Sequence, residues 1–193
     1  MKDGLVRPED MKTFSERIYN EASRLITLVE DIMKLSKLDE GAVELEKEEV
    51  DFYMLTREIC SRLAPQAEKR HVRVEVTGEP VHYLGVRQVL DEMLYNMIEN
   101  AIKYNKEGGL VSVWVGNTLQ GIKIIVRDTG IGIPKEEQER IFERFYRVDK
   151  SHSKATGGTG LGLSIVKHGA LMHGAKIDVD SEVNKGTKME LIF

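Results

Sequence analysis

The sequence predicts an α+β protein in which one long helix precedes a domain of mixed strands and helices. Apolar residues recur at heptad spacing from residue 11 to residue 35, which indicates a continuous helix. After residue 41, short segments that alternate at period two are mixed with amphipathic helical segments. The two kinds of segment do not alternate regularly, so a doubly wound nucleotide-binding fold is not expected.

The composition is that of a soluble globular protein that can bury a sizeable core. The chain has 193 residues, of which 41% are hydrophobic and 31% are charged. A net charge of -4 without a basic stretch argues against nucleic acid as a partner. No run of about 18 apolar residues is present, so neither a transmembrane helix nor membrane contact by this chain is expected. The one cysteine, Cys60, fits a reducing, cytoplasmic compartment and is expected to be a small core residue.

The first helix is predicted to begin near Pro8, where proline and acidic residues suit a first turn, and to end near Gly41. Its seam of apolar a and d positions, interrupted at Glu21, consists of Met11, Phe14, Ile18, Leu25, Leu28, Ile32 and Leu35. This seam needs a partner, which is another chain, a helix outside this sequence, or the rest of the chain. We favour a dimerisation element, and we place a domain boundary between residues 1–41 and 42–193.

The elements after the boundary follow from periodicity and from turn residues. Strands are expected over residues 43–50, 71–77, 81–84, 111–116, 122–128, 176–181 and 187–193. Helices are expected over residues 52–63, 86–103, 135–145 and 161–172. Asp51 is a suitable N-cap for the first of these helices, and Pro65 is expected near its end or at a kink. Residues 151–160 are small, polar and rich in glycine, which is typical of a mobile loop.

The helix over residues 86–103 is expected to have a polar face opposite its apolar one. Asn96 and Asn100 lie one turn apart and project from the same side, together with Glu92 and Lys103. The opposite stripe consists of Val89, Leu90, Met93, Leu94, Met97, Ile98 and Ala101. A solvated surface explains each polar residue taken alone. The alternative, the wall of a polar cleft, depends on the motifs downstream.

The run Asp128-Thr129-Gly130-Ile131-Gly132 follows directly on an apolar strand. A carboxylate at a strand end can accept a hydrogen bond from an exocyclic amine such as that of adenine. The glycines let the backbone pass close to a flat ring. Strand-to-turn Asp-Gly sequences are common, so this motif is a weak signal by itself.

A second glycine cluster, GGTGLGL at residues 157–163, leads into a helix. Backbone N–H groups at a helix N-terminus form a site for anions such as phosphates, although a flexible linker has a similar composition. The cluster matches neither a Rossmann fingerprint nor a P-loop. Between the clusters, IFERFYR at residues 141–147 offers aromatic anchors for a lid and an arginine for a terminal phosphate. Core packing explains Phe142 and Phe145 equally well.

The order of these motifs resembles the N, G1, F and G2 boxes of the catalytic domain of sensor histidine kinases. That domain belongs to the wider ATPase group of gyrase, heat-shock chaperone and MutL-type proteins. The resemblance covers residues 43–193, and FERFYRVD and EVNKGT favour the kinase branch. It implies a Bergerat-type ATP-binding fold, a two-layer α/β sandwich with a mixed β-sheet packed on helices. The first helix, ending in KLSKLDEG, resembles the second helix of the kinase dimerisation domain.

The resemblance also assigns roles to individual residues. Asn100 would bind Mg²⁺, with Asn96 as a second ligand or a phosphate contact, since carboxamide oxygens are hard ligands. Asn96, Asn100, Lys103 and Arg147 are the residues assigned to catalysis. Asp128 would hold the adenine amine, and Arg147 would approach the γ-phosphate. The nucleotide contacts implied are Asn100, Lys103, Tyr104, Asp128, Gly130, Gly132, Ile133, Arg147, Gly158, Thr159, Gly160, Leu161, Gly162, Leu163 and Thr187.

The activity that this resemblance implies is a protein-histidine kinase of a two-component system. It would bind Mg-ATP and donate the γ-phosphoryl group to a histidine. The implied partners are a second copy through the first helix, the phosphoacceptor helix of the intact kinase and the receiver domain of a response regulator. The parent protein would be anchored in the plasma membrane.

One feature of the family is missing from the sequence. The family's acceptor histidine is followed by an acidic residue and then an Arg/Thr-Pro pair, and none of the five histidines has this context. The chain is therefore expected to lack its acceptor helix and not to phosphorylate itself. Two alternatives stay open: a regulatory nucleotide-binding module without turnover, and a gyrase- or MutL-like ATPase using Glu92 or Glu99. The second is disfavoured because Asn100, rather than Asn96, is followed by an NAxK-type run.

Overall fold

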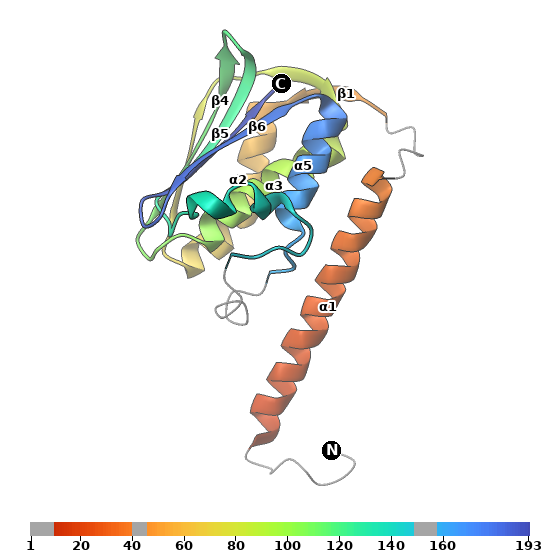
Figure 1. Cartoon of the computed structure of the whole chain (residues 1–193), viewed down its shortest axis with the longest axis vertical. Helices are drawn as coiled ribbons and strands as arrows, with labels where there is room; N and C mark the ends of the chain where they lie inside the picture. Colours follow the sequence, from red (N-terminus) through yellow and green to blue (C-terminus); the bar gives the residue numbers. More distant parts are fainter. Residues whose placement is uncertain (1–9, 40–45, 149–157) are drawn as a thin grey trace.

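The computed structural model describes residues 10–39, 46–148 and 158–193. One long helix, α1 (Met11–Asp39), stands beside a body made of sheets and helices (Figure 1). The predicted end of this helix at Gly41 and the predicted boundary at residue 41 lie outside the described residues. The continuous helix from Met11 to Asp39 confirms the long helix that the heptad pattern predicted.

The body contains a five-stranded sheet and a separate two-stranded sheet. The strands of the larger sheet are β2 (Arg73–Gly78), β4 (Leu110–Thr118), β5 (Gly121–Asp128), β6 (Lys176–Glu182) and β7 (Gly186–Ile192). Their order is β2-β4-β5-β7-β6, with β2 parallel to β4 and the other pairs antiparallel. β1 (Glu48–Asp51) pairs antiparallel with β3 (His82–Gly85) in the smaller sheet. The mixed sheet confirms the predicted α+β class.

Three helices cover one face of the larger sheet (Figure 1). They are α2 (Phe52–Lys69), α3 (Arg87–Lys103) and α5 (Gly162–His173). Asp51 caps α2 as predicted, because its carboxylate accepts from the N–H groups of Tyr53 and Met54 at 2.9 and 3.1 Å. The core between the layers includes Leu55, Ile59, Leu90, Leu94, Ile98, Val111, Val113, Val115, Ile124 and Leu191. These residues belong to the apolar faces predicted by helical spacing in the helices and by alternation at period two in the strands.

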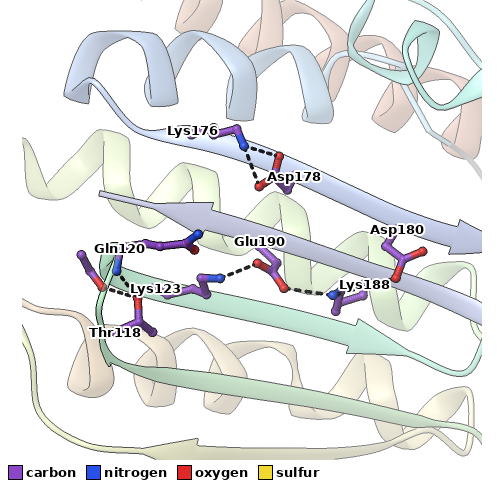
Figure 2. Close-up of polar contacts among 9 residues, drawn as sticks. Thr118, Gln120, Lys123, Lys176, Asp178, Asp180, Lys188 and Glu190 are labelled. Carbon is purple, nitrogen blue, oxygen red and sulfur yellow. Dashed lines mark hydrogen bonds and ion pairs between the residues drawn. The ribbon is translucent and has the colours of Figure 1, made fainter.

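The other face of the sheet is lined by ion pairs (Figure 2). Lys123 of β5 donates to Glu190 of β7 at 2.8 Å, and Lys188 lies 3.1 Å from the same carboxylate. The side chains of Lys123 and Glu190 are only 16% and 12% exposed. The hydrogen bond from Lys123 lowers the pKa of Glu190. Opposite charges across neighbouring strands stabilise the sheet, and they keep this face polar, so the body has two layers.

The prediction of a short helix over residues 135–145 is wrong. The structure has two 3₁₀ turns there, η2 (Lys135–Glu137) and η3 (Arg140–Phe142), and only Ile141 is buried. Phe145 adopts a positive φ of 64°, and its N–H donates to the carbonyl of Gly160 at 2.9 Å. This pairing with a distant segment replaces the next helical hydrogen bond, so the helix does not continue.

α1 touches the body through part of its seam. Leu28 packs on Leu161 and Ile165 at the start of α5. At this position of the seam, the partner is therefore the rest of the same chain. Ile18 and Leu25 are 50% and 53% exposed. In the part of the chain that is described, no helix is long and apolar enough to span a membrane.

Candidate nucleotide-binding site

Asp128 lies at the end of β5 with its carboxylate held from one side. Its Oδ1 accepts from the N–H of Gly130 at 2.8 Å and from the N–H of Thr187 at 3.2 Å. Burial raises the pKa of Asp128, while the two N–H groups act against this shift. No hydrogen bond to Oδ2 is found among the described residues. The carboxylate is therefore fixed in direction and keeps one oxygen for a ligand.

The loop after Asp128 needs glycine at two positions. A Cβ on Gly130 would collide with the carbonyl oxygen of Tyr104, where the loop passes the end of α3. Gly132 has a φ of 68°, which L side chains rarely adopt, and a Cβ there would collide with the carbonyl of Glu182. The loop is therefore pressed between α3 and the turn that joins β6 to β7.

A serine that sequence reasoning missed ties this loop to β6 and β7. Ser181 Oγ accepts from the N–H of Ile133 at 2.8 Å and lies 2.8 Å from Thr187 Oγ1. The N–H of Asn184 donates to the carbonyl of Ile131 at 2.7 Å. Ile133 and Thr187 are thus brought to the same end of the site as Asp128, through contacts between segments far apart in the sequence.

The two asparagines of α3 differ in their contacts. Asn96 donates from Nδ2 to the carbonyl of Glu92, one turn back, at 2.8 Å. Its Oδ1 faces Gly162 so closely that a Cβ on this glycine would collide with it. The side chain of Asn100 is half-buried and has no hydrogen-bond partner within the described ranges. A half-buried carboxamide without a partner is suited to a ligand, and its oxygen is of the kind that Mg²⁺ accepts.

Positive charge gathers at the end of α3. Lys103 Nζ lies 5.7 Å from the centroid of the Tyr104 ring, and a Cβ on Gly158 would be 2.7 Å from this nitrogen. Burial is the largest cause of a lowered pKa at Lys103, and the charges of Arg147 and Arg70 lower it further. Glu99 and Asp31 act in the opposite direction. An anion bound here would relieve the repulsion among the three cations.

The arginine of the aromatic motif lies at the base of the glycine-rich loop. Arg147 Nη1 donates to the carbonyl of Gly158 at 2.7 Å, and Phe145 pairs with Gly160. The predicted lid spans residues 151–160, of which 151–157 lie outside the described residues. Two hydrogen bonds therefore join the chain before this segment, at Phe145 and Arg147, to its described end, at Gly158 and Gly160.

The start of α5 presents main-chain groups to the site. Thr159 Oγ1 accepts from the N–H of Leu161 at 3.3 Å, and α5 has no side-chain cap at its N-terminus. The side chains of Leu161 and Leu163 pack inward, in two apolar clusters. Because the N–H of Leu161 is taken by Thr159, the N–H groups of Gly162 and Leu163 are the ones that can be offered to a ligand, together with the positive end of the helix dipole.

Direct contacts join several of the segments that carry the predicted site residues. Gly130 meets Tyr104, Gly158 meets Lys103, and Gly162 meets Asn96. Asn105, two residues beyond the end of α3, also lies among these segments. Its Oδ1 accepts from Thr129 Oγ1 at 3.2 Å, and its Nδ2 donates to the carbonyl of Leu110 at 3.1 Å. The bond from Thr129 joins residues 24 positions apart, so no local sequence pattern indicated this role.

The fold and the site define an ATPase domain of a known class. Residues 85–193, more than half of the chain, match the profile of the family described as histidine kinase-, DNA gyrase B-, and HSP90-like ATPases. The chain belongs to this family. Within it, the chain is 38% identical over 187 residues to the sensor-like histidine kinase SenX3 of Mycolicibacterium smegmatis, across 95% of this chain and 48% of the relative. The chain thus spans about half the length of the curated relative.

Solved structures agree with this placement. The histidine kinase ShkA, solved at full length in complex with AMPPNP, matches with a TM-score of 0.79 at 26% identity, over 93% of this chain and 38% of that chain. The histidine kinase ThkA, solved in complex with the response regulator protein TrrA, matches with a TM-score of 0.73 at 25% identity, over 99% of this chain and 53% of that chain. The resemblance to sensor histidine kinases and the predicted two-layer fold are confirmed.

Proposed function

We propose that this chain binds Mg-ATP and supplies the γ-phosphoryl group that a two-component histidine kinase transfers to a histidine. The observation that carries the proposal is Asp128, with one oxygen fixed by two N–H groups and the other without a partner among the described residues. The cations Lys103 and Arg147 both meet a different segment, at Gly158. An adenine amine at one end and phosphates at the other fit this arrangement.

The adenine end would be built by the loop after β5. Asp128 Oδ2 would accept a hydrogen bond from the exocyclic amine, and guanine, which carries a carbonyl at that position, would not satisfy it. Gly130 and Gly132 would let the base lie against the backbone, beside Tyr104, Ile133 and Thr187. The complex of ShkA with AMPPNP, an ATP analogue, supports a nucleotide in this fold.

The phosphate end would be built by α3 and by the start of α5. Asn100, with Asn96 beside it, fits Mg²⁺, which would neutralise charge on the phosphates when bound. Lys103 and Arg147 would place positive charge against the β- and γ-phosphates. Main-chain N–H groups between Gly158 and Leu163 would complete the cradle. These residues bind and orient the triphosphate, and positioning of this kind provides most of the catalysis in phosphoryl transfer.

The proposed transfer moves the γ-phosphoryl group to a ring nitrogen of a histidine. The bond between the γ-phosphorus and the oxygen bridging to the β-phosphate breaks, a phosphorus–nitrogen bond forms, and ADP leaves. None of the histidines in the sequence lies before residue 71. The acceptor is therefore proposed to be a histidine on a separate helix of the intact kinase, and this chain should not phosphorylate itself.

The partners follow from the same proposal. Residues 1–41 would contribute a helix to a homodimer, and residues 42–193 would form the catalytic domain. The phosphohistidine would then be used by the receiver domain of a response regulator, as the complex of ThkA with TrrA supports. The kinase as a whole is proposed to be anchored in the plasma membrane, with this part in the cytoplasm.

Isothermal titration calorimetry with ATP, with and without Mg²⁺, tests the binding part of the proposal. Radiolabelled ATP with a histidine-bearing acceptor helix, supplied as a separate chain, tests the transfer. We expect acid-labile label on the acceptor helix and none on this chain. Binding without any transfer would favour a regulatory nucleotide-binding module. Absence of ATP binding would refute the function at its first step.

A further inference from the structure

A contact outside the predicted motifs joins the end of α2 to the end of α3. Arg70 is the C-cap residue of α2, and its Nη1 donates a hydrogen bond of 2.8 Å to the carbonyl oxygen of Lys103. Lys103 is the last residue of α3, so its carbonyl is one of those that a helix leaves without an intrahelical partner. Arg70 therefore closes the helix that carries the proposed metal and phosphate ligands.

The peptide unit between Lys103 and Tyr104 is held on both sides. Its N–H donates to the carbonyl of Asn100 at 2.9 Å, and its carbonyl accepts from Arg70. The next carbonyl, that of Tyr104, accepts from the N–H of Ile131 at 3.1 Å. The backbone torsions beside this unit set the directions of two side chains. Arg70 thus helps to fix where Lys103 and Tyr104 point.

The backbone of Arg70 is itself well anchored. Its N–H donates to the carbonyl of Ala67 at 3.1 Å, and His71 follows with a φ of 54°, which reverses the chain. The carbonyl of His71 then accepts from the N–H of Gly108 at 3.0 Å. Arg70 therefore reaches Lys103 from a fixed junction between α2 and β2, as a group that positions another residue must.

The charge of Arg70 also suits the phosphate end. Its charge acts on Lys103 together with that of Arg147. Arg70 is exposed, and no ion pair of its side chain is found among the described residues. The hydrogen bond to Lys103 uses one of its five N–H donors. The charge of Arg70 therefore lies at the same end of α3 that the triphosphate is proposed to approach.

We propose that Arg70 is a positioning residue of the nucleotide site, acting through the Lys103–Tyr104 peptide. This inference rests on the proposed function. Tyr104 is assigned to the adenine face and Lys103 to the phosphates, so loss of Arg70 weakens the binding of adenosine as well as of ATP. A residue that acted through its charge alone would weaken the binding of ATP only.

Calorimetry on two variants tests this inference. Arg70→Met removes the charge and the donors while keeping the length, and we expect about fivefold weaker binding of both ATP and adenosine. Arg70→Lys keeps the charge and an N–H donor and should recover part of both affinities. Arg73→Met is the matched control, because Arg73 is exposed on β2 and pairs with Glu75. Unchanged binding by Arg70→Met, or a loss for ATP alone, would overturn the proposal.

Amide hydrogen exchange without nucleotide gives an independent readout. The N–H of Tyr104 should exchange faster in Arg70→Met than in the wild type or in Arg73→Met. The amides of β4 and β5 should keep their protection, and its loss there would show a purely structural role and overturn the proposal. Unchanged exchange at Tyr104 would also overturn it. If the wild type binds neither ATP nor adenosine, the proposed function fails, while the exchange at Tyr104 still decides whether Arg70 fixes this peptide.

Discussion

Thr159 and Asp31 are joined by a hydrogen bond of 2.6 Å, in which Thr159 Oγ1 donates to Oδ2 of Asp31. Asp31 lies on α1, whereas Thr159 lies in the glycine-rich segment that is proposed to hold the phosphates. Beside this bond, Leu28 of α1 packs on Leu161 and Ile165. The long helix therefore meets the body at the place where the phosphates are proposed to lie.

Replacing Thr159 should loosen this contact. Thr159→Val keeps the shape of the side chain but removes the hydroxyl that bonds to Asp31, which should cost about 1 kcal/mol. We expect amide exchange over residues 25–33 of α1 to become about fivefold faster in the variant. Thr27→Val is the control, because the Thr27 hydroxyl bonds only within α1, to the carbonyl of Ser23 at 3.2 Å. Equal exchange in both variants would show that the Thr159–Asp31 bond does not hold α1 in place.

Asp128→Asn should weaken ATP binding by about 1–3 kcal/mol. Asparagine replaces one carboxylate oxygen with an NH₂ group, which donates where the aspartate accepted, so one buried donor is left without an acceptor. Calorimetry with ATP measures this loss. The same variant should not bind GTP more weakly than the wild type does. Asp180→Asn removes an exposed carboxylate of β6 on the far face of the sheet (Figure 2) and should leave ATP affinity unchanged. An Asp128→Asn protein with wild-type affinity would refute the adenine assignment.

Asn100→Ala should reduce the effect of Mg²⁺ on nucleotide binding. In the wild type, we expect Mg²⁺ to strengthen ATP binding, and loss of one carboxamide ligand should reduce that gain on the order of tenfold. Affinity for ATP measured in EDTA should stay close to that of the wild type. Asn117→Ala, at an exposed position on β4, is the control and should keep the full gain. A Mg²⁺ effect of the same size in Asn100→Ala would remove this residue from the metal site.

The periodicity of the sequence predicted the helices α1, α2, α3 and α5 and the strands, because burial on one face selects apolar residues at regular positions. The predicted end of α2 at residue 63 is too early, since the helix continues through Pro65 to Lys69. The order of the strands in the sheet has no such signal in the sequence. The parallel pairing of β2 with β4 and the separate sheet of β1 and β3 depend on contacts between distant segments. The 3₁₀ turns around Ile141 show the same limit, because the pairing of Phe145 with Gly160 overrides a helical pattern.

The motifs of the site could be predicted because each is a short run with a resemblance to known boxes. Residues that support those motifs could not. Ser181 and Arg70 each act on a backbone group far away in the sequence, at Ile133 and Lys103, and neither belongs to a motif. The unequal engagement of Asn96 and Asn100 also depends on geometry, since both lie on the same helical face.

His173 should make stability depend on pH just below neutrality. Its Nε2 accepts from the N–H of Val86, the N-cap of α3, at 3.1 Å, and its Nδ1–H donates to the carbonyl of Gly169 at 2.8 Å. Burial lowers the pKa of His173, and the charge of Lys47 lowers it further. Between the lowered pKa and the ordinary value of 6.5, the unfolded chain binds more protons than the folded one. The contribution of neutral His173 to the free energy of unfolding is therefore fully present above pH 6.5 and is lost as the pH falls below this value.

Thermal unfolding of the wild type and of His173→Gln at a series of pH values measures this effect. Glutamine can still offer an oxygen to Val86 but does not titrate, so the variant should lose the part of the decline that lies just below pH 6.5. His82→Gln, at an exposed position on β3, should keep the wild-type profile. Identical profiles for the wild type and His173→Gln would assign the pH dependence to other groups.

The exposed seam of α1 should support self-association. Ile18 and Leu25 occupy a positions of the heptad and are half exposed, and a row of exposed apolar side chains on one face of a helix is typical of an interaction surface. Light scattering over a range of concentrations should show a dimer. Ile18→Glu places a charge in the seam and should shift the dimer to monomer, whereas Ser23→Glu adds the same charge at an f position, which faces away from a partner helix. Because Leu28 is already packed on α5, the seam used by a dimer should lie mainly before residue 28. A monomeric wild type at high concentration would instead leave the contact with α5 as the role of this helix.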